Sequence, residues 1–370
     1  MCRTGGPWRR RHGPPVRPVA DSGAFRYVRI DSRHARTRLP LLRPEPRRHR
    51  RRRRRPGGRP APVRDRRVAR LRHGLGARTA LRAVPDEPDD LLRRRRARTS
   101  TIAFGTAVLG MRYEDPVRLA EDASTVDLLS GGRVQLGIST GIAGYGPILD
   151  PVFGTVDRSF RDEAEARAAR LLEVLQGEPL GSAGKGYESI PAGADLTLQP
   201  LSPGLRDRVW WGGGSMGTAV RTAEKGLLLH CSTLNTEDTG APFAQAQADQ
   251  IAAYRERFAE LHPQRESKVA VGRIVVPLLD DHDRAVHEEF LTGYASGMDD
   301  EGRPLSGTPP FRFSKVVSGE PAAIVDSLLA DPAVTATDEL VITLPANGDR
   351  AAHERILRIV AEEIAPALRA

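Results

Sequence analysis

The sequence predicts a parallel α/β fold, readable from residue 98 to residue 370. Three observations support this prediction. Short apolar stretches such as residues 340–344 recur along this region and suit buried parallel strands. They alternate with segments whose apolar residues recur at helical spacing. Several of the stretches end in glycine and hydroxyl residues, where parallel α/β folds place their ligands.

The apolar stretches mark five or six strands after residue 98. A closed barrel needs eight strands, and the missing ones would have to lie in the preceding region, which shows no convincing strand pattern. The sequence therefore predicts a barrel that is incomplete or disordered at its N-terminal end. The expected strands cover residues 102–108, 134–138, 209–211, 227–231, 269–279 and 340–344.

Capping residues set the expected helix boundaries. Asp115 offers an N-cap, with Pro116 at the first helical position, and Gly131 suits a left-handed C-cap. Residues 141–157, which are rich in Gly and Pro, are expected to be a long connecting segment. Other helices are expected at residues 164–175, 251–261, 282–294, 321–329 and 356–368, with one more ending at Gly226.

Residues 1–97 form a separate Arg-rich region. Residues 1–98 hold 32 of the 57 basic residues, no Lys and eight of the 47 acidic residues. The net charge is therefore +24 in this segment and −14 in the remainder, so the value of +10 for the whole chain describes neither part. Neither a strand nor a helix period persists there. We expect a segment that buries too little apolar surface to order itself.

Three explanations of this region remain open. It is a solvated basic tail, or an arm that binds nucleic acid or a membrane surface through arginine, or the product of GC-rich DNA read out of frame. The absence of Lys and the abrupt change near Ala97 favour the last explanation. We do not expect nucleic acid as a partner, because the patterned part of the chain is acidic.

The remaining composition points to a cytoplasmic protein without a metal site. Cys2 and Cys231 lie far apart in the sequence, which does not indicate a disulfide framework. No apolar run approaches the roughly 18 residues of a membrane span, and the start of the chain does not read as a signal peptide. No zinc spacing, nucleophile elbow or P-loop is present.

Four expected strand ends are polar or glycine-rich. In a parallel barrel the carboxyl ends of the strands share one rim, which is where ligands bind. The sequence therefore places a candidate site on this rim. The four strand ends are residues 105–107, 139–141, 212–215 and 232–233.

The glycine-rich turn at residues 212–215 is the most informative of the four. It leaves an expected strand and opens a helix, so the free N–H groups of the helix start and the hydroxyls of Ser215 and Thr218 suit a phosphate. The same residues also suit a tight strand-to-helix turn in which Ser215 is an ordinary N-cap. The sequence leaves both interpretations open.

Other candidates carry less chemistry. Ser139 and Thr140 suit a pocket wall or an ordinary strand end. His230 and Cys231 lie on an apolar stretch and are expected in the core. Adjacent glutamates on a helix point in different directions and make poor acid–base pairs. Three further histidines are expected to be solvated on helices, namely His282, His287 and His353.

The stretch from residue 102 to residue 154 resembles the luciferase-like monooxygenases. The matching elements include Asp115-Pro116 at a helix start, the run of residues 127–133 (Asp-Leu-Leu-Ser-Gly-Gly-Arg) and the strand at residues 136–141. Residues 209–215 are similar to the family's phosphate-binding strand. The resemblance extends over essentially all of residues 98–370.

The resemblance implies a (β/α)8 barrel, commonly a homo-oligomer, that binds FMN or the deazaflavin F420 at the rim. It implies a cis peptide at Ala107–Val108 beneath the flavin ring, and Ser139 near the reactive face. It also implies a phosphate site at residues 214–218. The cofactor-binding residues expected on this basis are Gly105, Thr106, Ala107, Val108, Ser139, Thr140, Gly213, Gly214, Ser215, Met216 and Thr218.

The implied activity is a flavin-dependent monooxygenase or oxidoreductase that uses reduced FMN and O2 on a small organic substrate. The alternatives are an F420-dependent hydride-transfer enzyme and a barrel remnant without catalysis. Two departures from the family matter. Thr140 stands where luciferases carry an arginine, and the family's Glu-His motif on the second strand has no match in residues 1–98. The catalytic residue therefore remains unassigned.

Overall fold

The computed structural model describes residues 100–369, apart from 155, 187–188, 306–310 and 347, together with two strands of the Arg-rich region. The expectation of a disordered or out-of-frame segment over residues 1–97 falls almost wholly outside the described residues. The two described strands are Arg26–Asp31 and His73–Gly76.

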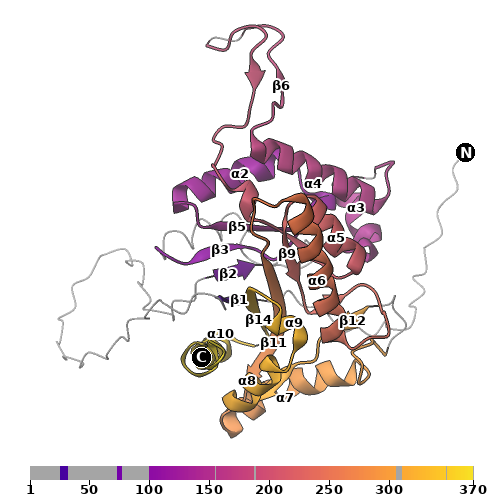
Figure 1. The fold of residues 1–370 in the computed structure, drawn as a ribbon, viewed down its shortest axis with the longest axis vertical. Helices are drawn as coiled ribbons and strands as arrows, with labels where there is room; N and C mark the ends of the chain where they lie inside the picture. Colours follow the sequence, from indigo (N-terminus) through magenta and orange to yellow (C-terminus); the bar gives the residue numbers. More distant parts are fainter. Residues whose placement is uncertain are drawn as a thin grey trace, which may run out of the picture.

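The main sheet closes on itself (Figure 1). Its strands pair in the order β11-β14-β1-β2-β3-β5-β8-β9, and β9 pairs again with β11. The prediction of a barrel of the (β/α)8 type is confirmed. The strands are β1 (Arg26–Asp31), β2 (His73–Gly76), β3 (Ala103–Thr106), β5 (Val134–Ser139), β8 (Val209–Gly213), β9 (Leu228–Cys231), β11 (Val269–Pro277) and β14 (Glu339–Leu344).

The strands after residue 100 match the sequence prediction. Six of them form part of the closed sheet, and wherever two of these six are paired, the pairing is parallel. The two N-terminal strands were not indicated by the sequence, and they correct the expectation that residues 1–98 lack strands. β2 is parallel to β3. β1 is antiparallel to both β2 and β14, with Arg26 level with Leu344, which departs from an all-parallel barrel.

Alternation along the strands separates the barrel interior from its outer layer. Trp210 of β8, Leu228 of β9, Ala270 of β11 and Val341 of β14 pack together with Ala107, so side chains from separate strands meet inside the barrel. The intervening residues face outward against helices. Burial on both faces explains why these strands read as continuous apolar stretches.

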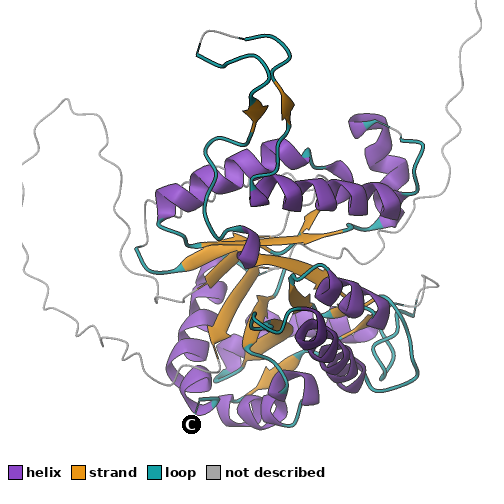
Figure 2. Cartoon of the chain, turned by 45° about the horizontal axis from the view of Figure 1, so that its top comes forward, coloured by secondary structure: helices purple, strands orange, loops and turns teal. Residues whose placement is uncertain are grey.

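Helices cover the outside of the sheet (Figure 2). Asp115 caps the first of them as expected, since its carboxylate accepts hydrogen bonds from the N–H groups of Val117 and Arg118, and Gly131 takes the left-handed conformation that ends it. The helices are α2 (Pro116–Ser130), α3 (Gly146–Phe153), α4 (Phe160–Gln176), α5 (Met216–Glu224), α6 (Phe243–Leu261), α7 (Asp281–Ser296), α8 (Pro321–Leu329), α9 (Pro332–Thr335), α10 (Arg350–Ile359) and α11 (Ala365–Ala367).

Short elements outside the closed sheet were not predicted. The connection between α4 and β8 forms a projecting hairpin (Figure 1). A second small pairing joins the segment after β9 to a segment near residue 312. The elements are β4 (Leu109–Gly110), β6 (Gly181–Ser182), β7 (Asp195–Leu196), β10 (Leu234–Asn235), β12 (Arg312–Phe313) and β13 (Val317–Gly319).

Two expectations about exposure and order are corrected. Part of residues 141–157, expected as a connecting segment, forms α3. His287 and His353, expected to be solvated, are buried because they lie on the inward faces of α7 and α10. His282 is exposed as expected. Among the helices that the structure describes, none is long and apolar enough to cross a membrane.

Candidate cofactor site

The carboxyl end of β3 carries the feature that the family resemblance implied. The peptide bond between Ala107 and Val108 is cis. The Val108 side chain lies against the neighbouring strands, because a Cβ added to Gly212 would stand 3.1 Å from Val108 Cγ2 and one added to Gly137 would stand 3.1 Å from Val108 Cγ1. Glycine at both positions therefore makes room for Val108 at the rim.

Gly105 and Thr106 hold β3 against β5 just below this point. A Cβ on Gly105 would stand only 1.6 Å from the carbonyl oxygen of Gln135, so the close approach of the two backbones requires glycine. Thr106 Oγ1 donates to the Gly137 carbonyl at 2.8 Å and accepts from the Gly137 N–H at 3.0 Å. These contacts give both residues a structural role.

A small cavity lies on the inner side of the cis peptide, with Ala107 and Val108 among its lining residues. Trp210 and Gln135 line it as well, and the indole N–H of Trp210 donates to Gln135 Oε1 at 2.8 Å. His230, expected in the core, is 5% exposed and also faces this cavity. Cys231 points outward and is fully buried, and burial raises the pKa of its thiol to about 12.

Ser139 and Thr140 lie at the end of β5, beside the same rim. Ser139 Oγ accepts from the N–H of Gly141 at 3.2 Å, and its Cβ is 3.6 Å from the position that a Cβ of Gly212 would take. Thr140 Oγ1 donates to the Gly141 carbonyl at 3.4 Å. Val108, Ser139 and Gly212, from three neighbouring strands, thus form one surface, here called the ring surface.

The turn after β8 delivers the start of α5 to this rim. Ser215 is the N-cap, and its Oγ accepts from the N–H of Thr218 at 3.2 Å and lies 2.8 Å from Thr218 Oγ1. Gly213 and Gly214 are buried, whereas Met216 and Gly217 are exposed. The N-cap interpretation is therefore correct, and the exposed first turn leaves the anion-binding interpretation open.

An acidic side chain that the sequence did not indicate meets this turn. The N–H of Met216 donates to Glu237 Oε1 at 2.5 Å. Glu237 follows β10, 21 residues further along the chain, and no local motif connects the two positions. The N-terminus of α5 thus already binds an anionic oxygen, as expected where free N–H groups and the positive end of the helix dipole coincide.

Arg221, one turn into α5, was also missed. Its Nη2 donates to Thr218 Oγ1 at 3.2 Å, and its Nη1 lies 3.2 Å from where a Cβ of Gly217 would stand. Within residues 100–369, apart from the gaps given above, no carboxylate pairs with it. A cation near the positive end of a helix is unfavourable unless an anion binds both the cation and the helix N-terminus. The recurrence of Ser215, Thr218 and Arg221 at three-residue intervals on one helix was the sequence signal that could have identified Arg221 as part of this site.

A model of the luciferase-like monooxygenase family matches residues 96–340. The chain belongs to the luciferase-like monooxygenase family. The match begins two residues before the boundary expected between residues 97 and 98, and it confirms the resemblance seen in residues 102–154. The comparison with curated proteins found no relative.

Solved structures of similar fold include monooxygenases and F420-dependent enzymes. The oxygenating constituent of 3,6-diketocamphane monooxygenase from Pseudomonas putida, in complex with FMN, has a TM-score of 0.57 at 16% identity, over 80% of this chain and 89% of its own. EDTA monooxygenase from a Chelativorans species has a TM-score of 0.53 at 16% identity, over 77% and 78%. The coenzyme F420 dependent tetrahydromethanopterin reductase from Methanopyrus kandleri has a TM-score of 0.50 at 16% identity, over 76% and 87%.

In this member of the family, the run of residues 127–133 that carried the resemblance has a structural role. Asp127 is buried, and its carboxylate accepts hydrogen bonds from Arg208, Ser202 and the N–H of Val134. Burial opposes ionisation of Asp127, but these hydrogen bonds hold its pKa below the usual value. Arg133 bonds the carbonyls of Ser130 and Ile102. The run fixes the turn between α2 and β5.

The described part of β2 has the sequence His-Gly-Leu-Gly, with its one histidine at the start of the strand. β2 begins at His73, which is level with Ala103 at the start of β3, and it ends at Gly76, level with Thr106. Its carboxyl end therefore brings no histidine to the rim. Metal-binding clusters of His, Cys, Asp and Glu are likewise absent from the part of the chain that the structure describes.

Proposed function

We propose that this chain is a flavin-dependent oxidoreductase of the monooxygenase type, which uses reduced FMN and O2 on a small organic substrate. One observation carries the proposal: the N-terminus of α5, which binds an anionic oxygen through the Met216 N–H, opens on the same rim as the ring surface. A phosphate group and a flat ring are the two parts of FMN that such a rim must hold.

The first turn of α5 is suited to the phosphate. The Gly217 N–H is exposed at a helix start, where intrahelical acceptors are lacking. The hydroxyls of Ser215 and Thr218 lie 2.8 Å apart and share one hydrogen bond, so one of them keeps a proton to donate, and Arg221 adds a positive charge. Glu237 is the chain's own stand-in for the ligand, since a carboxylate and a phosphate present the same kind of oxygen to an N–H group.

The ring surface is suited to a flavin ring. Val108 fills the space that a side chain on Gly212 would take, and Ser139 stands beside it, so two small side chains form the surface on which we place a planar group. Bound reduced FMN would supply the electrons that activate O2. The residues of the chain would place the ring and keep water from its face, with Val108 as the apolar contact and Ser139 Oγ as a hydrogen-bonding group.

The solved structures support a flavin-type cofactor without choosing one. One similar structure contains FMN and another is described as F420-dependent, so F420 remains the alternative. Location in the cytoplasm, homo-oligomerisation and the boundary between residues 97 and 98 stay predictions. So do the cofactor contacts expected of Gly105, Thr106, Ala107, Thr140, Gly213 and Gly214.

The test is an anaerobic titration of the full chain with FMN, riboflavin and F420, followed by O2 uptake with reduced FMN. We expect FMN to bind, and Arg221→Gln to weaken FMN binding about tenfold, the typical effect of losing a charged hydrogen bond, while riboflavin binding is unchanged. Arg257→Gln, on the exposed surface of α6, is the matched control. Binding of F420 in place of FMN would establish the alternative. A folded chain that binds none of the three would be a barrel without this activity.

A further inference from the structure

We propose that Glu237 is an internal competitor for the cofactor's phosphate: its carboxylate occupies the N-terminus of α5 and must leave before a phosphate can bind there. This inference rests on the proposed function and adds a residue that sets the preference between flavins with and without a phosphate.

The contact is well defined. Glu237 Oε1 lies 2.5 Å from the N–H of Met216, the first residue of α5. N–H groups in the first turn of a helix have no acceptor within the helix. The carboxylate therefore satisfies a donor that is exposed to solvent and stands at the positive end of the dipole. Because 21 residues separate the two partners, the contact depends on the tertiary fold.

A carboxylate and a phosphate cannot share this turn. Both are anions that need the same N–H groups, and two negative charges a few ångströms apart repel each other. Occupancy by Glu237 therefore excludes the phosphate from Met216, and a bound phosphate displaces Glu237. A flavin that lacks the phosphate does not enter this competition.

The backbone around Glu237 is fixed on both sides. Residues 236–241, here called the strap, are tied to the glycine turn because the Thr236 N–H donates to the Gly214 carbonyl at 2.7 Å and Thr236 Oγ1 donates to it at 3.1 Å. The strap thus follows the same turn that begins α5. Glu237 is presented to Met216 by this pairing.

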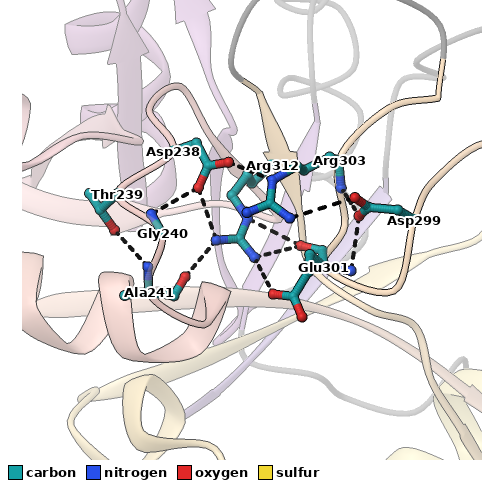
Figure 3. Close-up of polar contacts among 8 residues, drawn as sticks. All are labelled: Asp238, Thr239, Gly240, Ala241, Asp299, Glu301, Arg303 and Arg312. Atoms are coloured by element: carbon teal, nitrogen blue, oxygen red, sulfur yellow. Dashed lines mark hydrogen bonds and ion pairs between the residues drawn. The ribbon is translucent and has the colours of Figure 1, made fainter.

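The other side of the strap is held by ion pairs (Figure 3). Asp238 accepts from Arg303 Nε at 2.6 Å and from Arg312 Nη1 at 3.1 Å. Arg312 is 2% exposed and also bonds the Ala241 carbonyl and Glu301. Since Thr236 and Asp238 are both anchored, displacement of Glu237 requires a rotation of its side chain and leaves the strap in place.

The experiment compares FMN, riboflavin and inorganic phosphate on the full chain. We expect Glu237→Ala to bind FMN about tenfold more tightly than the wild type, because a competing charged hydrogen bond is removed. Glu237→Gln keeps an oxygen for the Met216 N–H but loses the charge, so its affinity for FMN should be intermediate. Riboflavin affinity should be the same in all three proteins, and phosphate should bind most tightly to Glu237→Ala.

Glu224→Gln is the matched control, because it removes the same charge at the opposite end of α5, where Glu224 pairs with Arg257. It should leave the affinity for FMN unchanged. Circular dichroism melting of each variant checks that it folds. If Glu237→Ala does not fold, Glu237→Gln still offers an oxygen to the Met216 N–H and carries the test.

Unchanged or weaker binding of both FMN and phosphate to the Glu237 variants would overturn the inference. If phosphate binding increases but no variant binds FMN, the competition stands and the flavin assignment fails. An equal gain for riboflavin and FMN would also overturn the inference, since it would place Glu237 against the ring rather than the phosphate.

Discussion

Asp127 and Arg208 form a two-point ion pair in which Nη1 and Nη2 of the arginine each lie 2.7 Å from a different carboxylate oxygen. Asp127 is at the inner face of α2 and fully buried, whereas Arg208 directly precedes β8. Since Asp127 also accepts from the Val134 N–H at 2.9 Å, one carboxylate joins α2, β5 and the entry to β8. Asp127 of α2 therefore helps to position β8, the strand that leads into the glycine-rich turn.

Replacement of this carboxylate should destabilise the whole barrel. We expect Asp127→Asn to lower the free energy of unfolding by about 3 kcal/mol, because removing one partner leaves the other charge poorly compensated. Urea denaturation of both proteins measures the difference. Glu121→Gln, which breaks an exposed pair with Arg118 on the same helix, should change stability little. Equal effects of the two substitutions on the free energy of unfolding would contradict the stabilising role of Asp127.

The same carboxylate predicts an acid-dependent loss of stability. The folded state lowers the pKa of Asp127, so its stabilisation is present above the unfolded value of about 3.9 and is lost as the pH falls through the folded value. The wild type should therefore lose stability below about pH 4 more steeply than Asp127→Asn. Unfolding curves from pH 6 down to the acid limit measure both slopes, and parallel curves would rule out this role.

His287 predicts a second pH effect in a higher range. Burial lowers its pKa, the nearby His353 and His282 act in the same direction, and Asp283 opposes them. The folded state therefore favours neutral His287, and stability should fall as the pH drops below the unfolded value of about 6.5. His287→Gln should flatten the melting temperature between pH 7.5 and pH 5, whereas His282→Gln, at an exposed site, should not. If the melting temperature of His287→Gln falls with pH as steeply as that of the wild type, His287 is not the group responsible.

Gly212 tests the ring surface. A Cβ at this position would stand 3.1 Å from Val108 Cγ2, so a valine would displace the Val108 side chain that forms the surface assigned to the ring. We expect Gly212→Val to weaken FMN and riboflavin alike by at least about tenfold, since steric overlap forfeits close packing. Fluorescence titration measures both. Gly184→Ala adds a methyl group where nothing lies within 4 Å and serves as the control. Loss of FMN binding alone would place Gly212 at the phosphate instead.

The two arginines that bind Asp238 should differ in importance. Arg312 is 2% exposed on its side chain and Arg303 is 40% exposed. Arg312→Gln should lower the free energy of unfolding by about 3 kcal/mol because its carboxylate partners lose a buried cation. Arg303→Gln should have a small effect, because solvent screens an exposed pair. Chemical denaturation of the two variants tests this, and a larger effect for Arg303→Gln would refute it.

The sequence predicted the elements whose signal is local. Asp115, Pro116 and Gly131 mark the limits of α2 because capping depends on adjacent residues, and apolar continuity marks β11 and β14. The hairpin of β6 and β7 was missed because a strand of two residues carries no period. His287 was misplaced because its charged neighbours along the helix conceal which face packs inward.

The candidate site was predicted in part for the same reason. Val108, Ser139 and Ser215 follow strands that are visible in the sequence, and their convergence on one rim follows from the topology of a parallel barrel. Glu237 was missed because its contact with Met216 spans 21 residues and no motif announces it. β1 and β2 were missed because their segments lie among arginines that obscure any strand pattern.

The direction of β1 changes the composition of the rim. Because β1 runs antiparallel to β14, Arg26 is level with Leu344 at the carboxyl end of that strand. β1 therefore begins at the rim on which β11 and β14 end. The rim thus combines the carboxyl ends of parallel strands with the amino end of one reversed strand, which brings backbone N–H and C=O groups of opposite orientation to the same edge.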